Sequence, residues 1–248
     1  MPATETLLLA ALITTVTYCV FGFTGSGSTV LALPLLAHFL PLKFAVPLLM
    51  LLDLAASLAV STRGRGVVRR DEFGRVLPFL VVGVVLGLTL LIQLPEAPLL
   101  VALGVFLVCY AAWCLRPRGA PLGLSRAWAA PIGVASGALS ALFGTGGVLT
   151  TLYFTGRLSD KDELRATSAA AVLVNSLTRL VLFGATGLLT QEGLLWSALA
   201  LLPGVLFGLF VGQRLHASAA PAGVLRAVYA VLLVAGVSLL ARYAPSLP

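Results

Sequence analysis

Apolar runs with almost no charge make up most of this sequence, and they constrain the fold more than any other feature. Of 248 residues, 59% are hydrophobic and 10% are charged, and the mean hydropathy is +1.06. Ordinary soluble domains carry about 25% charged residues. Because a soluble fold of this size could not bury so much apolar surface, the sequence predicts a membrane protein.

The apolar runs between polar residues predict ten helical segments. They lie near residues 5–22, 28–40, 43–62, 75–93, 97–115, 127–142, 147–157, 163–185, 191–214 and 221–241. No basic residue precedes the first run, which favours a retained helix over a cleaved signal peptide. Segments 28–40 and 147–157 are too short to cross comfortably, because a membrane-spanning helix needs about 20 residues. We interpret both as half-helices that can return to the face from which the preceding segment entered.

The basic residues follow the loops of this arrangement. If the segments alternate across a bilayer, one side receives thirteen Lys and Arg residues, and the other receives only Lys43 and Arg242. The positive-inside rule then predicts that both termini face away from the cytoplasm. The formal net charge of +7 therefore reflects membrane topology, and no nucleic-acid partner is predicted.

A weak internal repeat divides the chain. A shift of 119 residues places Gly25 on Gly144, Gly27 on Gly146 and Ser57 on Ser176. Five segments per half is an odd number, so the second half would be inverted relative to the first, as in many secondary transporters. The predicted fold is an all-α polytopic membrane protein with two inverted repeats, 1–115 and 127–248, joined by a cytoplasmic linker, 116–126. A plain bundle without a repeat is the alternative.

Glycine-rich breaks interrupt both repeats at matching places. Unpaired backbone survives at membrane depth only where protein covers it or where it lines a polar cavity. Amides freed at such a break, together with the N-terminus of the following half-helix, can hold an anion. The alternative is that these glycines only let helices pack closely. The predicted contributors are Thr24, Gly25, Ser26, Gly27, Ser28 and Thr29 in the first break, and Gly144, Thr145, Gly146 and Gly147 in the second.

Ionisable residues inside apolar segments are costly and usually functional. Arg179 lies well inside 163–185, with Asn175 on the same helix face four residues earlier. It is a predicted direct anion ligand; an ion pair with Asp53 and snorkelling to the outer interface are the alternatives. Asp53 could hold Arg179, carry a proton during transport or serve helix packing. Ser57, one turn after Asp53, is also predicted to line the cavity.

The glycine breaks and the residues around them resemble the sulfite exporter TauE/SafE family. The first repeat carries the resemblance in Phe21-Gly22-Phe23-Thr24-Gly25-Ser26-Gly27 followed by Leu33-Pro34-Leu35-Leu36. The second carries it in the run from Ser136 to Gly147 followed by Leu164-Arg165-Ala166-Thr167-Ser168-Ala169. The resemblance implies a bacterial inner-membrane permease for small sulfur-containing anions such as sulfite or sulfonates. Tyr153 departs from it, because the second repeat of the family often has proline there.

No catalytic or nucleotide-binding motif appears, so the sequence predicts a secondary transporter that works by alternating access and not an enzyme. A membrane-embedded structural subunit or enzyme without transport activity is the alternative. No cofactor and no metal are predicted, and Cys19, Cys109 and Cys114 have no spacing that suggests a disulfide or a metal site. The predicted partners are a small anion and the lipid bilayer. A homodimer is left open.

Overall fold

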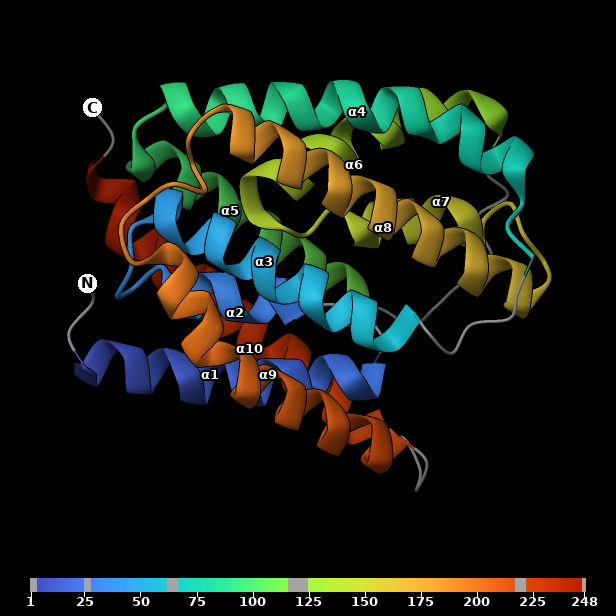
Figure 1. Cartoon of the computed structure of the whole chain (residues 1–248). Helices are drawn as coiled ribbons and strands as arrows, with labels where there is room; N and C mark the ends of the chain where they lie inside the picture. The colour runs from blue at the N-terminus through green and yellow to red at the C-terminus, as the bar shows by residue number, and fades with distance from the viewer. Residues whose placement is uncertain (1–3, 25–27, 62–66, 116–124, 217–221, 247–248) are drawn as a thin grey trace. The chain divides into compact units, whose positions relative to one another are not determined.

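The computed structural model consists of helices joined by short connections (Figure 1). It describes residues 4–24, 28–61, 67–115, 125–216 and 222–246. Within these residues there are ten α-helices, two short 3₁₀ helices and no strand. The α-helices are α1 (Thr4–Thr24), α2 (Ser28–Leu36), α3 (Leu42–Ser61), α4 (Arg70–Gln93), α5 (Glu96–Leu115), α6 (Ala129–Phe143), α7 (Gly147–Thr155), α8 (Lys161–Ala185), α9 (Leu194–His216) and α10 (Ala222–Tyr243).

The helices confirm the predicted all-α membrane fold. Among the described residues, six helices are long and apolar enough to cross a bilayer: α1, α3, α4, α5, α8 and α9. The half-helices α2 and α7 have nine residues each, less than half of what a crossing needs. The half-helix α7 follows an interruption of the helical backbone at the second glycine-rich break, whereas residues 25–27 before α2 lie outside the described part of the chain.

The start of α4 differs from the sequence prediction. The helix begins at Arg70 and not near residue 75, so its first turn contains Asp71 and Glu72. Acidic side chains are favourable there because the N-terminal end of a helix carries partial positive charge. The apolar pattern could not reveal this turn, which is charged.

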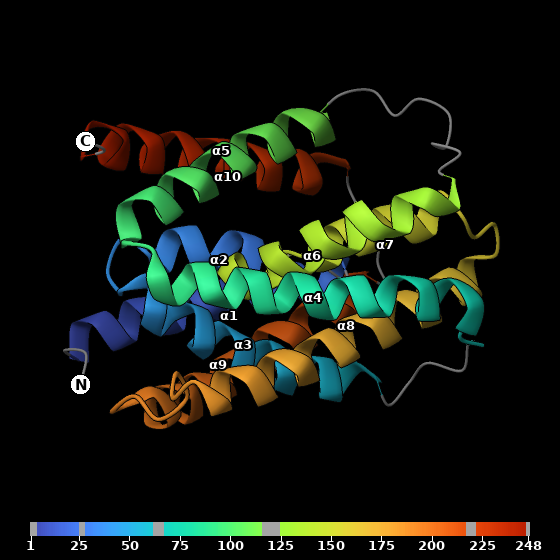
Figure 2. The ribbon, with the colours of Figure 1, turned by 90° about the horizontal axis from the view of Figure 1, so that it is seen from above.

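The helices form two compact units, which are described separately. The first contains residues 1–49, 93–119 and 192–248. In it, α1 packs along α9 and α5 packs along α10, as Figures 1 and 2 show. The half-helix α2 packs against α1, α10 and α5.

The second unit contains residues 50–92 and 120–191. Here α4 packs closely against α6. The backbones are so near that a Cβ at Gly83 or Gly137 would overlap the backbone of the other helix. The half-helix α7 packs against both α6 and α8. Each unit combines helices from both predicted repeats, and the inverted repeats with their linker 116–126 stay a prediction.

Candidate functional site

The second glycine break is a tight backbone turn between α6 and α7. Gly144 ends α6 in the left-handed conformation, with φ of 69°, and its amide donates to the carbonyls of Leu139 and Ser140. A side chain disfavours this conformation, so glycine suits the position. Thr145 and Gly146 follow, and α7 begins at Gly147.

Hydroxyl groups of α6 and α7 hold the break against α6. The Ser136 hydroxyl donates to the Gly146 carbonyl oxygen at 2.6 Å and lies 2.5 Å from the Thr150 hydroxyl. Both side chains are buried. A Cβ at Gly146 would overlap the Ser136 carbonyl, so the close approach requires glycine here. Close packing thus accounts for the glycine at position 146, while the anion-binding role of its amide stays a prediction.

Helix α8 adds a buried polar face beside the break. The Asn175 side-chain amide donates to the Ser140 hydroxyl of α6. One turn later, Arg179 is 3% exposed, and its guanidinium lies 5.4 Å from the ring centre of Phe183. Asn175 and Ser176 are also buried. The Arg179 side chain is therefore buried within the protein. Its role as an anion ligand stays a prediction.

Several hydrogen-bonding groups at the break have no partner among the described residues. The Thr145 hydroxyl and the Asn175 side-chain oxygen are buried without a hydrogen bond there. The first amides of α7, at Gly146 and Gly147, donate no hydrogen bond within the described part of the chain. Amide and hydroxyl donors at a helix N-terminus are the groups that a small anion needs.

The first break is described only at its edges. Helix α1 ends at Thr24 and α2 begins at Ser28, while Gly25, Ser26 and Gly27 lie outside the described residues. Ser28 and Thr29 are buried at the start of α2. This break belongs to the first unit and the second break to the other, so a site built from both stays a prediction.

Two further predicted residues lie on α3. Asp53 and Ser57 are each partly exposed, one turn apart. The predicted ion pair of Asp53 with Arg179, its two alternative roles and the cavity-lining role of Ser57 all stay predictions.

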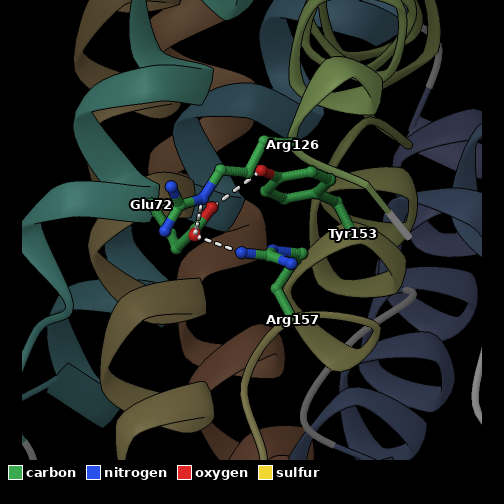
Figure 3. A network of polar contacts seen from close by, with 4 residues as sticks. All are labelled: Glu72, Arg126, Tyr153 and Arg157. Carbon is green, nitrogen blue, oxygen red and sulfur yellow. Dashed lines mark hydrogen bonds and ion pairs between the residues drawn. The ribbon is translucent and has the colours of Figure 1, made fainter. Parts of the chain in front are cut away.

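A second polar cluster joins α4 to the far end of α7 (Figure 3). The Glu72 carboxylate accepts a hydrogen bond from the Tyr153 hydroxyl at 2.8 Å and another from the Arg157 guanidinium at 2.9 Å. Arg126 approaches the same carboxylate at 3.7 Å. Glu72 is 6% exposed and Tyr153 is fully buried. The hydrogen bond to Glu72 also raises the pKa of the Arg157 guanidinium above its usual value.

Comparison with known proteins identifies the family. The sequence model of the sulfite exporter TauE/SafE family matches residues 9–239. The chain belongs to this family. It is also 30% identical over 198 residues to a probable inner membrane transporter protein, TsaS, from Comamonas testosteroni, and the match covers 77% of this chain and 81% of the relative. No solved structure matches significantly.

Membership in the TauE/SafE family confirms the resemblance seen in the sequence. The chain is a multi-pass membrane transporter and not an enzyme, as predicted. Tyr153 stands where the resemblance to the family suggested proline. The hydroxyl of a buried tyrosine needs a hydrogen-bond partner, so this position indicates a polar contact.

Sequence reasoning missed the Glu72 cluster of this TauE/SafE protein. The predicted segment begins near residue 75, which leaves Glu72 in a loop before it. The departure at Tyr153 was the available signal, since its hydroxyl required an acceptor somewhere. Nothing in the sequence points to Glu72, which lies 81 residues earlier, as that acceptor.

Proposed function

We propose that this protein is a secondary transporter of small sulfur-containing anions, such as sulfite or organosulfonates, in a bacterial inner membrane. The family description names sulfite export, and the relative from Comamonas testosteroni is named an inner membrane transporter. Transport runs by alternating access about the two glycine breaks, which would expose the anion first to one side and then to the other.

The donors at the second break are the observation that carries this proposal. The N-terminus of α7 supplies about half a positive charge, and the amides of Gly146 and Gly147 point from that end of the helix. The Thr145 hydroxyl is a buried donor without a partner in the described structure. Arg179 and Asn175 lie on the buried face of α8. An anion of one or two charges suits these donors, since they offer hydrogen bonds and positive potential together.

The membrane potential can drive export without another energy source. A single charge moving through 100 mV gains about 2.3 kcal/mol. That energy corresponds to an accumulation ratio of nearly fiftyfold for a monovalent anion leaving a negative-inside cell.

Substitution of Thr145 by valine tests the anion site directly. Valine keeps the shape of threonine and removes only a hydroxyl that has no hydrogen bond in the described residues. Thr145→Val should therefore fold normally and raise the KM for sulfite uptake into proteoliposomes about tenfold, because a hydrogen bond to an anion is lost. Thr155→Val is the matched control, since Thr155 is exposed in the last turn of the same half-helix and bonds only the Thr151 carbonyl.

An unchanged KM in Thr145→Val would show that the Thr145 hydroxyl does not bind the anion. Absence of saturable flux for sulfite, sulfonates and a wider panel of small anions, in protein that is folded, would overturn the proposal as a whole. Flux of other anions but not of these would correct only the substrate class.

A second experiment separates the roles of Arg179 and Asp53. If Arg179 binds the anion, Arg179→Gln abolishes flux while Asp53→Asn preserves it. If the two side chains form an ion pair, each single substitution destabilises the protein. The double variant should then lose less stability than the sum of the two single losses. If Asp53 carries a proton, Asp53→Asn removes the pH dependence of flux and leaves anion binding intact.

A further inference from the structure

A groove lies between the start of α4 and the short 3₁₀ helix, Arg126–Trp128, that leads into α6. Its volume is about 400 Å³, and it is open to the surface of the protein. Arg75 and Arg126 stand on its two sides, and Phe79, Ala127 and Ala130 form part of its apolar lining. A Cβ built at Gly74 would meet no atom within 4 Å, so this part of the wall is open. All of these residues belong to the second unit.

The sequence places this groove at the level of the lipid headgroups. Arg75 is the last charged residue of α4, and uncharged residues fill the helix from Val76 to Gln93. Arg126 likewise precedes an uncharged stretch that runs through α6 and α7 to Arg157. Trp128, which is 52% exposed, lies beside Arg126, and tryptophan is enriched at membrane interfaces. The two guanidinium groups thus mark the boundary between water and hydrocarbon on this unit.

An exposed apolar stripe continues from the groove along α4. Phe79, Val82 and Leu86 are 39%, 51% and 50% exposed and lie on one helix face. The neighbouring face of α4, with Gly83 and Gly87, lies about a quarter turn further round the helix and packs closely against α6. A ligand in the groove would therefore meet positive charge at one end and an apolar helix surface beyond it.

We propose that the groove binds the phosphate headgroup of an anionic phospholipid, with its acyl chains along the exposed stripe of α4. Arginine is suited to phosphate because its guanidinium can donate two parallel hydrogen bonds. Basic pockets between membrane helices bind anionic lipid headgroups in this manner. Glu72 offsets only part of the positive charge, because its single carboxylate is hydrogen-bonded by Arg157 and ion-paired with Arg126 at 3.7 Å. The positive charge of the groove therefore rests mainly on Arg75. Among the described residues Arg75 makes no hydrogen bond or close ion pair, and its charge acts on Glu72 only at longer range, so its guanidinium can donate to a lipid phosphate.

The lipid site is tested with purified full-length protein in detergent, by thermal unfolding during titration with lipids of identical acyl chains. Phosphatidylglycerol should raise the unfolding midpoint and phosphatidylcholine should not. Arg75→Gln should weaken the apparent affinity for phosphatidylglycerol about fivefold, the factor expected for one interfacial basic residue. Arg75→Lys should keep most of the affinity, and the midpoint of Arg75→Gln without lipid should equal that of the wild type.

Arg242→Gln is the matched control, because it removes one positive charge at the end of α10, where the guanidinium lies over the ring of Tyr243. Its affinity for phosphatidylglycerol should be unchanged. Equal stabilisation by both lipids, or an equal loss in Arg242→Gln and Arg75→Gln, would overturn the proposal. Full competition by inorganic phosphate or by sulfite would also overturn it, since the groove would then be a site for soluble anions. None of these outcomes depends on transport.

Discussion

The two half-helices have the same length and the same place after a glycine break, but they are held differently. Eight of the nine residues of α2 are buried, and from Val30 to Leu36 the helix is entirely apolar. Only three residues of α7 are buried, namely Thr150, Tyr153 and Phe154, and two of these make side-chain hydrogen bonds. From Val30 onward, apolar burial thus holds α2, whereas α7 has specific polar contacts near both of its ends.

The helix pairs in the same two units are, in contrast, alike. On α9, a Cβ at Gly208 or Gly212 would overlap the carbonyls of Thr15 and Cys19 on α1. On α4, a Cβ at Gly83 or Gly87 would overlap the carbonyls of Val134 and Ala138 on α6.

The contacted carbonyls occupy matching places in the two halves. The shift of 119 residues that aligns the glycine breaks also carries Thr15 to Val134 and Cys19 to Ala138. The glycines themselves are 125 residues apart, from Gly83 to Gly208 and from Gly87 to Gly212, so only the carbonyl side of the packing follows the shift of 119. The two helix pairs thus share a glycine-to-carbonyl contact, and the duplication of the two halves stays a prediction.

Leucine at Gly87 or at Gly212 tests the likeness of the two helix pairs and should have the largest effect. Either side chain must push apart two helices whose backbones touch, which should cost about 3 kcal/mol. Both variants should lower the midpoint of thermal unfolding in detergent by a similar amount. Gly184→Ala is the control, since the nearest atom to its added Cβ is 3.8 Å away. A large loss in only one of the two leucine variants would show that the pairs are not equivalent.

The polar contact at the end of α7 should matter more than the corresponding contact at the end of α2. Glu72→Ala leaves the Tyr153 hydroxyl and the Arg157 guanidinium without their shared acceptor, at a cost of about 2 kcal/mol. At the other half-helix, the His38 ring lies 2.7 Å from the Pro34 carbonyl and 3.3 Å from the Ser238 hydroxyl. His38→Ala should cost less than about 1 kcal/mol, because its contact with Ser238 is exposed.

Asp71→Ala is the control for Glu72→Ala, because Asp71 is the exposed neighbour in the same helical turn. Unfolding midpoints measured side by side give the order of the three variants. If His38→Ala is as destabilising as Glu72→Ala, the contrast between the two half-helices fails.

The helices and the position of the breaks could be predicted from the sequence, because hydropathy and glycine act locally. Segment 147–157 became α7, and the interruption after residue 142 became the turn at Gly144–Gly146. The burial of Asn175 and Arg179 also follows from local reasoning, since polar groups in an apolar helix must turn away from lipid.

The contacts that hold α7 could not be predicted in the same way. Tyr153 meets Glu72 across 81 residues, and Asn175 meets Ser140 across 35. Helical periodicity gives the face of a side chain but not the helix that this face meets. Ser136 and Ser140 looked like small residues of a family motif, and only the fold shows that they bond the break and α8.

Loss of the contact that holds the second break should have a smaller effect on stability than Glu72→Ala, but it should also change function. Ser136→Ala removes the hydroxyl that holds the Gly146 carbonyl, and it should destabilise the protein by about 1 kcal/mol. On α1, the Thr17 hydroxyl donates only to carbonyls of its own helix, at Ile13 and Thr14, so Thr17→Val should be nearly neutral. Because the Gly146 and Gly147 amides are proposed to bind the anion, Ser136→Ala should raise the KM for sulfite several-fold while Thr17→Val leaves it unchanged. Proteoliposome uptake over a range of sulfite concentrations measures both values. Equal KM values in the two variants would show that the polar contacts of α7 serve stability alone. The amides of its first turn would then not be part of the anion site.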